Sequence, residues 1–567
     1  MYQSRTSYSQ PGADQMFPRL SKPMLCQLAA YGTELAVPTD GILFERGARG
    51  VALYVVLNGE LEIREKRAGH LFSVIARLAK GQFTGEMDLL STRETLLDCV
   101  SVRPTRVLCI HREQLRRLMR AESEIAEIIT TACVKRRNEL LQEATGGVLL
   151  IGKRTCGPTM LLQRFLLRNS YPHRLLDLTF DAEASDLFEG LGLSIEQLPV
   201  AVLPDGRILH HPNIITVADS LGLNEPADAK DIYDVAVVGA GPSGLAAAVY
   251  AASEGLTTIA IEGNAPGGQA GTSSKIENYL GFPTGISGQE LAERAQIQAQ
   301  KFGARLAVSR NVTGLCKSEN VFHLVLEDGT GFAARAVVIA TGARYRKLDL
   351  PNYKVYETQG IHYAATPMEA AICMDEEVVV VGGGNSAGQA AIFLSQAANH
   401  VHLLIRGNNL ASTMSDYLVQ RIANSPKITL HANSTIIRLS GDSILREVTW
   451  ETRGAEQCIT RQIRNVFVMI GAKPNTEWLK GIVELDAAGF VQTDSTGGSI
   501  YATTLSGLFA VGDVRAGSTK RVASAAGEGS AVIAAVHAYL SQQRERTPMH
   551  TYPSDSAITS VVSAAAR

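Results

Sequence analysis

Two glycine-rich segments carry the clearest chemistry in this sequence. In the first, Gly239, Gly241 and Gly244 follow the apolar run 233–238. Gly239 would allow a tight turn, Gly241 would let the backbone approach a diphosphate, and Gly244 would let a helix pack closely on a strand. The next apolar run ends on Glu262, where a carboxylate can hydrogen-bond ribose hydroxyls. This spacing predicts a dinucleotide site with its diphosphate at a helix N-terminus.

The second glycine-rich segment repeats this arrangement. Gly382, Gly384 and Ala387 follow the apolar run 377–381, and the next apolar run ends on Arg406 instead of an acid. An acid at that place favours an unphosphorylated ribose, whereas an arginine can pair with a 2′-phosphate. The second site is therefore predicted to bind NADPH, with NADH as the alternative.

The elements that position both sites alternate along the C-terminal half. From residue 232 to about residue 543, buried-type strands alternate with helices, which predicts two Rossmann-type α/β nucleotide-binding domains. The polar tail 546–567 is expected to be disordered.

The N-terminal part divides into two further units. Short alternating runs between glycines over 35–111 predict a small antiparallel barrel or roll, followed by a helical stretch over 112–143. A strand at 148–151, a Gly-Pro turn, a helix at 160–169, strands at 175–178 and 200–203 and a closing helix predict a small α/β unit. The fold class is therefore multidomain, with a linker at 224–231.

Composition excludes several classes of partner. The 567 residues have a net charge of -2, so no overall field attracts nucleic acid or anionic lipid. No run of about 18 apolar residues is present, and the N-terminus has no signal-peptide pattern, so we expect a cytoplasmic protein without a membrane span. The eight cysteines are scattered and form no Cys-x-x-Cys pair, which favours reduced thiols. No metal site is predicted.

Three further segments identify a family. They are Ala340-Thr-Gly342-Ala343, the run 507–513 that ends in Gly512-Asp513, and Lys520-Arg521-Val522-Ala523. Together with the glycine signatures, their order and spacing over 231–545 closely resemble the low-molecular-weight thioredoxin reductases.

This resemblance implies FAD at the first signature and an NADPH domain inserted at 348–480 between the FAD-binding segments 226–347 and 481–545. Asp513 would contact the ribityl or phosphate region. Proteins of this type are usually homodimers that rotate the NADPH domain between hydride delivery and disulfide exchange. The cofactor-binding residues predicted for both sites are Gly239, Gly241, Gly244, Glu262, Gly268, Gln269, Asn278, Ala340, Gly342, Gly512, Asp513, Arg521, Val522, Ala523, Gly382, Gly384, Ala387 and Arg406.

The redox-active pair of that family is missing. Where these reductases have Cys-Ala-Thr-Cys, this chain has Ala364-Ala365-Thr366-Pro367, and alanine and proline form neither a thiolate nor a disulfide. Cys373 follows a few residues later. It is either a surrogate redox thiol near the flavin or a small hydrophobe in the core.

A second candidate thiol, Cys156, stands in the small α/β unit. Cys156-Gly157-Pro158 resembles the start of a thioredoxin active site, although Thr159 replaces the resolving cysteine. Pro199 resembles the cis-proline of that fold. The segment 147–225 is thus predicted to be a thioredoxin-like domain, with Cys156 either a single active thiol or a relic in a docking domain.

The roll over 1–146 resembles a cyclic-nucleotide-binding domain. Gly85 and Glu86 stand where that family binds the phosphate and the ribose, but Leu96-Leu97 occupy the place of the expected arginine. Arg93 could substitute for it. A cyclic nucleotide effector remains one interpretation of this unit, because a buried phosphate needs a cationic partner.

Three functions are compatible with these observations. The first is an FAD-dependent NADPH oxidoreductase resembling thioredoxin-disulfide reductase, which passes hydride to FAD and on to a protein or small acceptor and is regulated by the N-terminal domain. The second is an NAD(P)H-flavin diaphorase that acts on a ferredoxin, flavodoxin or quinone without disulfide chemistry. The third is a non-catalytic flavin-binding scaffold.

Overall fold

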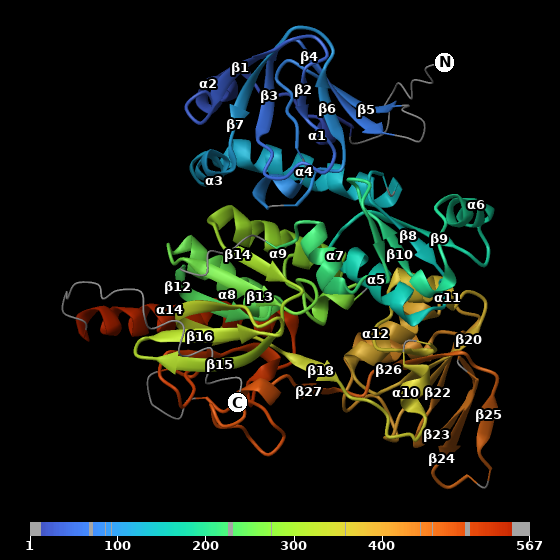
Figure 1. The fold of residues 1–567 in the computed structure, drawn as a ribbon. Helices are drawn as coiled ribbons and strands as arrows, with labels where there is room; N and C mark the ends of the chain where they lie inside the picture. The colour runs from blue at the N-terminus through green and yellow to red at the C-terminus, as the bar shows by residue number, and fades with distance from the viewer. Residues whose placement is uncertain are drawn as a thin grey trace.

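The computed structural model forms four units that follow one another along the chain (Figure 1). It describes residues 13–66, 72–85, 87–91, 93–143, 145–224, 231–273, 275–357, 359–442, 444–455, 457–493 and 499–546. Glu86, most of the linker and the tail beyond 546 lie outside the described residues. We call the units the roll, the second unit, the third unit and the fourth unit.

The roll consists of two antiparallel sheets. One has the order β1-β7-β3 and the other β2-β6-β4-β5. Glycine turns, such as Gly59 between β3 and β4, separate these short strands. The strands are β1 (Thr33–Val37), β2 (Ile42–Phe44), β3 (Leu53–Asn58), β4 (Glu60–Lys66), β5 (Phe72–Ala79), β6 (Asp98–Ser101) and β7 (Thr105–Ile110).

Helices flank the roll at both ends of its sequence. Before the sheets lie α1 (Ala13–Met16) and α2 (Lys22–Leu28), and after them α3 (Arg112–Ala121) and α4 (Ser123–Glu143). The single helical stretch predicted over 112–143 is wrong in one respect. Glu122 has φ -112° and ψ 81°, so the chain leaves the helical conformation there and begins a second helix.

The second unit is a four-stranded sheet of order β11-β10-β8-β9. Its strands β8 (Val148–Gly152) and β9 (His173–Asp177) are parallel and are joined by α5 (Gly157–Arg168). Strands β10 (Val200–Val202) and β11 (Ile208–His210) continue the sheet in antiparallel fashion. The Leu198–Pro199 bond is cis. Helix α6 (Ala182–Gly190) and β11 were not predicted, and α7 (Ile214–Ser220) closes the unit.

The third unit is built on a sheet of order β14-β13-β12-β17-β16-β15, with β28 paired to β17. The parallel strands are β12 (Ile232–Val238), β13 (Thr258–Glu262), β14 (Arg305–Val308), β17 (Gly331–Ile339) and β28 (Leu508–Ala510). Strands β15 (Val312–Ser318) and β16 (Val321–Leu326) are antiparallel. Helices α8 (Pro242–Ser253), α9 (Gly288–Phe302) and α14 (Val522–Arg546) accompany this sheet.

The fourth unit is inserted into the third. A two-stranded ribbon of β18 (Ala343–Tyr345) and β27 (Ala472–Pro474) joins them. Its parallel sheet has the order β19-β26-β20-β21-β22, formed by β19 (Ile361–His362), β20 (Glu377–Val381), β21 (His400–Leu404), β22 (Ile428–His431) and β26 (Asn465–Val468). A second, antiparallel sheet contains β23 (Ser434–Gly441), β24 (Leu445–Thr452) and β25 (Ile459–Arg461). The helices are α10 (Tyr353–Tyr356), α11 (Pro367–Ile372), α12 (Asn385–Leu394) and α13 (Asp416–Ala423).

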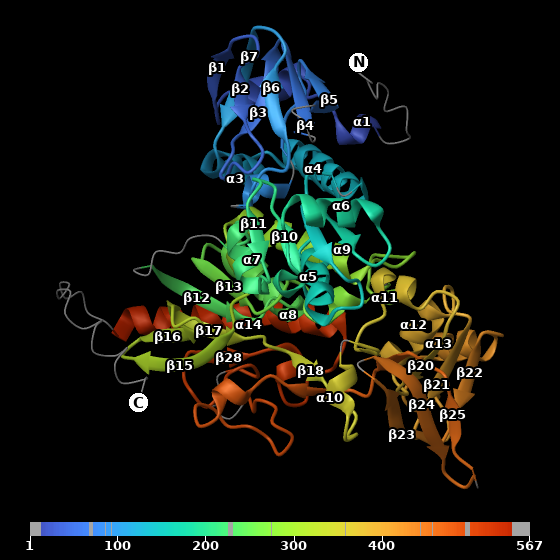
Figure 2. The same ribbon diagram turned by 45° about the vertical axis from the view of Figure 1, so that its right-hand side comes forward.

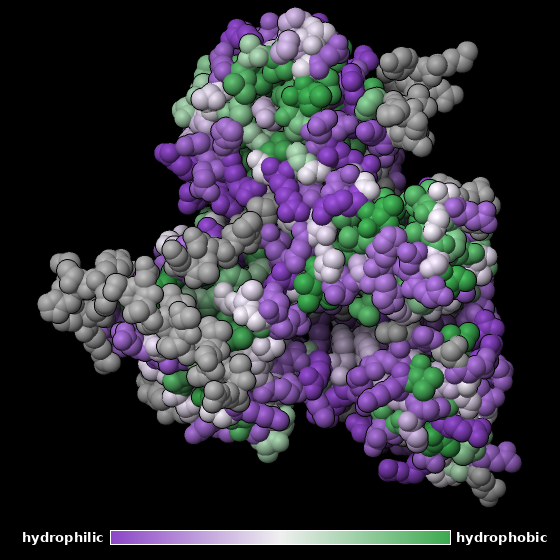
Figure 3. Space-filling view, viewed as in Figure 1, coloured by the Kyte–Doolittle hydropathy of each residue, from purple (hydrophilic) through white to green (hydrophobic). Residues whose placement is uncertain are grey.

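The second unit contacts the other three, and the roll also packs on α9 of the third unit through Ile297 (Figures 1 and 2). One buried apolar cluster runs from Leu97 and Leu140 of the roll through Phe165 of the second unit to Val235 and Ala248 of the third. The face in Figure 3 is largely hydrophilic between the third and fourth units, and the surface is hollowed there. Among the described residues, no helix combines the length and the apolar character needed to cross a membrane.

Candidate active site

The first glycine turn joins β12 to α8. Gly239 has φ +102°, and a Cβ there would collide with the backbone of Ala340, whose N–H donates to the carbonyl of Val238 at 2.8 Å. Gly241 is the N-cap of α8, and no atom except Gly268 Cα lies within 4 Å of where its Cβ would be. The space in front of the helix N-terminus is therefore open to a diphosphate.

Glu262 ends β13 beside this turn, as predicted. Its Oε2 accepts a hydrogen bond from the Ala240 N–H at 2.8 Å, and its Oε1 accepts one from the Asn264 N–H at 3.0 Å. Each carboxylate oxygen has a second lone pair. The backbone thus holds the carboxylate in place while acceptor capacity remains for ribose hydroxyls.

A second loop lies opposite the turn. A Cβ at Gly268 would come within 3.0 Å of Gly241 Cα, so these two glycines form adjacent walls of one cradle. The side-chain amide of Gln269 donates to the Ala343 carbonyl at the start of the ribbon. Gly342 precedes that ribbon with φ +62°, and Asn278 is exposed in the following loop.

The chain returns to the same site after β28. Gly512 has φ +73°, its N–H donates to Glu528 Oε2 at 2.7 Å, and a Cβ on it would collide with Ser243 of α8. Asp513 is thereby held next to the glycine turn, and burial raises the pKa of its carboxyl group, with Lys520 opposing. Arg521, Val522 and Ala523 follow where α14 begins, and their side chains are exposed or half-buried.

The second glycine turn joins β20 to α12. Gly382 has φ +142°, Gly384 is the N-cap of α12, and Ala387 is buried against the turn. A Cβ at Gly384 would meet no atom within 4 Å. The neighbouring loop is held by hydrogen bonds of 2.7 and 2.9 Å between Asn385 and Ser415, so the open space is framed by a fixed backbone.

Arg406 follows β21 at the predicted place. Its side chain is exposed, and no hydrogen bond or ion pair engages it among the residues that the structure describes. The guanidinium is therefore available to a 2′-phosphate.

The tetrad that replaces the family's cysteine pair leads into α11, which begins at Pro367. Thr366 is the N-cap, and its N–H donates to Glu369 Oε2 at 3.1 Å in a capping box. Ala365 and Cys373 are buried in the apolar cluster of the fourth unit. Burial raises the pKa of the Cys373 thiol, and Glu376 and Glu369 raise it further. This environment favours the structural interpretation of Cys373.

Cys156 is the N-cap of α5 and is partly exposed. At a rise of about 1.5 Å per residue, the helix carries it about 18 Å from Arg168 at the other end of α5. Because Arg168 is the residue that reaches the Gly268 loop, this thiol lies at the opposite end of α5 from the cofactor cradle.

Helix α5 touches both nucleotide-binding units, which no motif indicated. Arg168 Nη2 donates to the Gly268 carbonyl at 2.8 Å. One helical turn earlier, Arg164 forms a 2.9 Å salt bridge with Glu369 of α11, whose side chain is 2% exposed. Helix α5 therefore links the second unit to both the third and the fourth units, and Asp219 of α7 adds a 2.8 Å ion pair with Arg310 of the third unit.

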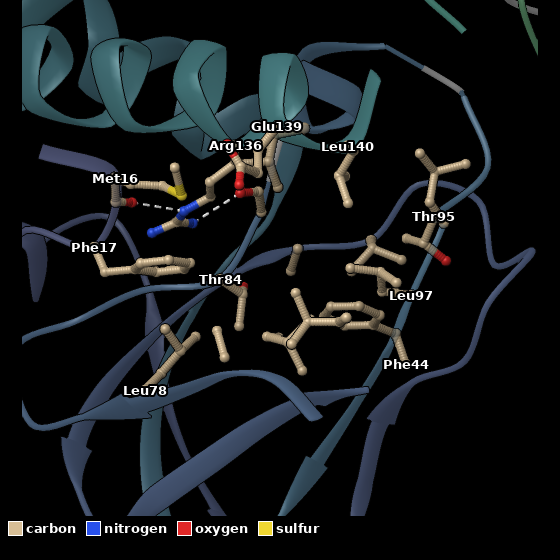
Figure 4. Close-up of a pocket in the computed structure, with 18 residues that line it drawn as sticks. Met16, Phe17, Phe44, Leu78, Thr84, Thr95, Leu97, Arg136, Glu139 and Leu140 are labelled. Carbon is tan, nitrogen blue, oxygen red and sulfur yellow. Dashed lines mark hydrogen bonds between the residues drawn. The ribbon is translucent and has the colours of Figure 1, made fainter. Parts of the chain in front are cut away.

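The roll contains a cavity of about 70 Å³ between its sheet β2-β6-β4-β5 and α4 (Figure 4). Apart from Thr84, Thr95, Arg136 and Glu139, the side chains that line it are apolar. Leu96 and Leu97 are buried in its wall at the place where the family expects an arginine.

The guanidinium in that wall is engaged by the protein. Arg136 Nε donates to the Met16 carbonyl at 2.9 Å, and Nη1 donates to the Gly85 carbonyl at 2.8 Å. Arg93 is buried but does not line the cavity. It interacts electrostatically with Glu293 of α9. Burial raises the pKa of the Glu293 carboxyl group, and Arg137 and Arg93 oppose that rise. The arginine of the cavity wall thus serves two backbone carbonyls, and Arg93 serves Glu293.

The two glycine turns fit the two dinucleotides that the motifs predicted. Each turn leaves open space before a helix N-terminus. Glu262 ends the strand after the first turn, and Arg406 follows the strand after the second, at the places where the motifs predicted contacts to the ribose. Asp513 and the Gly268 loop complete the first cradle from distant parts of the chain.

Comparisons with known proteins agree with this geometry. A model of the family "Pyridine nucleotide-disulphide oxidoreductase" matches residues 233–529, and one of the cyclic nucleotide-binding domain matches residues 34–122. The thioredoxin reductase of Treponema pallidum is 35% identical over 309 residues, which are 54% of this chain and 97% of that protein. The NADPH-dependent thioredoxin reductase 3 of Arabidopsis thaliana is 31% identical over 366 residues, or 60% of this chain and 67% of that protein.

A solved structure gives the same result. The thioredoxin reductase of Lactococcus lactis in its FR conformation aligns with a TM-score of 0.51 and 29% identity, over 55% of this chain and 99% of that one. The predicted resemblance to thioredoxin reductases is confirmed. The chain belongs to the pyridine nucleotide-disulphide oxidoreductase family and is an FAD- and NADPH-dependent oxidoreductase of the thioredoxin reductase type with an N-terminal cyclic nucleotide-binding domain.

Proposed function

We propose that this chain transfers hydride from NADPH to FAD and passes the electrons directly to an acceptor, without a thiol relay at 364–367. FAD supplies the two-electron chemistry when bound. The chain's own contribution is to hold the two dinucleotides on rigid strand-turn-helix elements and to select NADPH through Arg406.

The observation that carries this proposal is the structure of the tetrad. Ala364 and Ala365 precede α11, Thr366 caps it and Pro367 begins it, and none of the four offers sulfur. Cys373 is fully buried, and its raised pKa opposes formation of a thiolate, which is the reactive form. Cys156 lies at the far end of α5. Flavin oxidation by the acceptor itself is the route that needs none of these thiols.

Two classes of acceptor fit the site. The relatives' printed names point to a thioredoxin-like disulfide protein. A one- or two-electron carrier such as a ferredoxin, a flavodoxin or a quinone fits the missing cysteines better, because it requires no exchange with a protein thiol. Family membership favours both of these over a non-catalytic scaffold.

For the site residues, we propose the assignment made from the motifs. Gly239, Gly241, Gly244, Glu262 and Asp513 would hold FAD, and Gly382, Gly384, Ala387 and Arg406 would hold NADPH. The boundaries proposed for the domains are 226–347 with 481–545 for FAD and 348–480 for NADPH. A homodimer is proposed by analogy with the family.

The second unit, 147–225, is proposed to be a thioredoxin-like domain. Support comes from its strand order and from α5 between two parallel strands, with two antiparallel strands added beside the first. Its contacts through Arg164 and Arg168 favour a docking role. Cys156 as a single active thiol is the second candidate, favoured by its exposure at a helix N-terminus.

The roll is proposed to regulate the reductase. Its helix α4 contacts the rest of the molecule through Arg137, whose Nε donates to the Ser170 carbonyl at 2.9 Å, while Arg136 next to it lines the cavity. A ligand that displaced α4 would therefore disturb the second unit. Arg136 lines the cavity but already donates to two backbone carbonyls, and most of the wall is apolar. This disfavours a cyclic nucleotide, because a buried phosphate needs a strong cationic partner.

The test is anaerobic stopped-flow reduction by NADPH, followed by reoxidation with thioredoxin disulfide, a ferredoxin or a quinone, in wild type and in Cys156→Ser. We expect rapid flavin reduction in both proteins and equal reoxidation by the non-thiol acceptors. Reoxidation by thioredoxin that disappears in Cys156→Ser would overturn the direct route and establish a monothiol reductase.

A further inference from the structure

We propose that Arg168 of the second unit binds the diphosphate of FAD, so that the flavin site of the third unit is completed by a side chain from a neighbouring domain. The inference depends on FAD at the first glycine turn and is independent of which acceptor receives the electrons.

The position of Arg168 carries the inference. It is the last residue of α5, and its Nη2 donates to the carbonyls of Gly268 at 2.8 Å and Ala265 at 3.5 Å. Gly268 is one wall of the cradle, and Gly241 at the N-terminus of α8 is the other. The guanidinium therefore lies at the rim of the space where a diphosphate meets the helix N-terminus.

The guanidinium also has unused donors, and no described carboxylate lies close enough to form an ion pair with it. Nε and Nη1 of Arg168 make no hydrogen bond with any described residue, and no acid among those residues forms an ion pair with it. Arginine presents five donors in a planar fork that matches phosphate oxygens in bidentate geometry. A diphosphate in the cradle would supply oxygen acceptors for these unused N–H donors and negative charge opposite the guanidinium.

The surroundings of Arg168 bracket the diphosphate position. Burial lowers the pKa of its guanidinium, while Glu262 and Tyr345 raise it. Glu262 stands at the ribose end of the cradle, whereas Tyr345 lies near Asp513 on the side predicted for the flavin. Because the Arg168 guanidinium interacts with both Glu262 and Tyr345, it lies between the ribose end and the flavin end of the cradle. The diphosphate of FAD joins the adenosine half to the flavin half at that place.

Arg168 is held in this position by neighbouring contacts. Asn169 Nδ2 donates to the Asn264 carbonyl at 3.3 Å, and Gln289 Nε2 donates to the Leu167 carbonyl at 2.6 Å. The end of α5 is thus fixed on the cofactor loop before FAD binds. The end of α5 both holds the second unit on the cofactor loop and, by this proposal, contacts FAD. Bound FAD should therefore stabilise attachment of the second unit, and attachment should tighten FAD binding to the same extent.

The experiment measures binding of FAD, ADP and adenosine to the apoprotein by isothermal titration. A charge-assisted hydrogen bond contributes about 1.5–3 kcal/mol, so Arg168→Ala should weaken FAD and ADP binding by roughly tenfold to a hundredfold. Adenosine lacks the diphosphate, and its affinity should not change. Arg168→Lys retains the charge without the planar fork and should fall between the two.

Two variants of the same region serve as controls. Arg154→Ala removes a cation of the second unit that pairs with Asp177 away from the cradle, and it should bind FAD as wild type does. Gln289→Ala removes a docking contact but leaves the guanidinium. Wild-type FAD affinity in Arg168→Ala would overturn the proposal. Two further results would also overturn it, because they would indicate a docking role alone. These are equal losses of adenosine and ADP affinity in Arg168→Ala, and a loss of FAD affinity in Gln289→Ala that equals the loss in Arg168→Ala.

Discussion

Arg164 of the second unit forms a salt bridge with Glu369 of the fourth unit, at 2.9 Å between Nη2 and Oε1. The other oxygen of the same carboxylate caps α11 through Thr366. Glu369 thus stabilises the helix that replaces the redox-active cysteine pair and attaches it to a neighbouring domain. The tetrad 364–367 thus leads into a helix whose Glu369 makes a structural contact with a neighbouring domain.

Removal of that charge should destabilise the protein. Glu369→Gln keeps a carbonyl oxygen for the cap but removes the carboxylate charge that pairs with Arg164. We expect the free energy of unfolding to fall by about 2 kcal/mol, between the values for exposed and for buried ion pairs. Urea unfolding measures it. Asp442→Asn makes the same chemical change in the exposed pair with Arg446 and should leave stability unchanged; equal effects in both variants would contradict the assignment.

Arg406 should decide between the two nicotinamide cofactors. Because the side chain has no protein partner among the described residues, Arg406→Ala should raise KM for NADPH about tenfold through loss of one charge-assisted contact, and KM for NADH should stay the same. Steady-state kinetics with both cofactors measures this. Arg438→Ala removes a cation of the same unit that pairs with Glu447 and should change neither KM. Equal KM changes for NADPH and NADH in Arg406→Ala would contradict a 2′-phosphate contact.

His431 should make stability depend on pH. Burial lowers its pKa to about 4, and His402, Arg461 and His400 lower it as well. The unfolded chain therefore binds more protons at this residue between its ordinary pKa of about 6.5 and pH 4, so the free energy of unfolding should fall as the pH drops through that range. Unfolding of wild type and His431→Gln across the range measures the effect. A slope that is the same in both would exclude His431 as its source.

Cys373 should resist alkylation in the folded protein. Its side chain is fully buried and burial raises the pKa of the thiol, so thiolate formation is disfavoured. Mass spectrometry after iodoacetamide treatment should find label on the exposed Cys26, Cys316 and Cys458, and on Cys373 only after unfolding. Rapid labelling of Cys373 in the native protein would restore it as a redox candidate.

The dinucleotide sites could be predicted because their information is local. Gly239, Gly382 and Glu262 lie within short strand-turn-helix segments, where steric demands on the backbone appear directly as glycines. The break between α3 and α4 could not be predicted, because the helical pattern continues on both sides of Glu122 and only the local backbone geometry divides it.

The contacts of α5 were beyond prediction for a different reason. Arg164 and Glu369 are 205 residues apart, and Arg168 and Gly268 are 100 apart. Arginines on a helix are usually solvated, so their type and spacing give no signal of a partner in another domain. The burial of Cys373 likewise depends on how the end of α11 packs in the apolar cluster of the fourth unit. The sequence pattern did not determine that packing.

The most direct test of the account is an anaerobic titration of the FAD-loaded protein with NADPH, followed by flavin absorbance. FAD accepts two electrons and a redox-active disulfide would accept two more. If the flavin is the only redox centre, one equivalent of NADPH per FAD will complete the reduction. Consumption of a second equivalent before the flavin is fully reduced would contradict the account, and repetition with Cys156→Ser and Cys373→Ser would identify the thiol responsible.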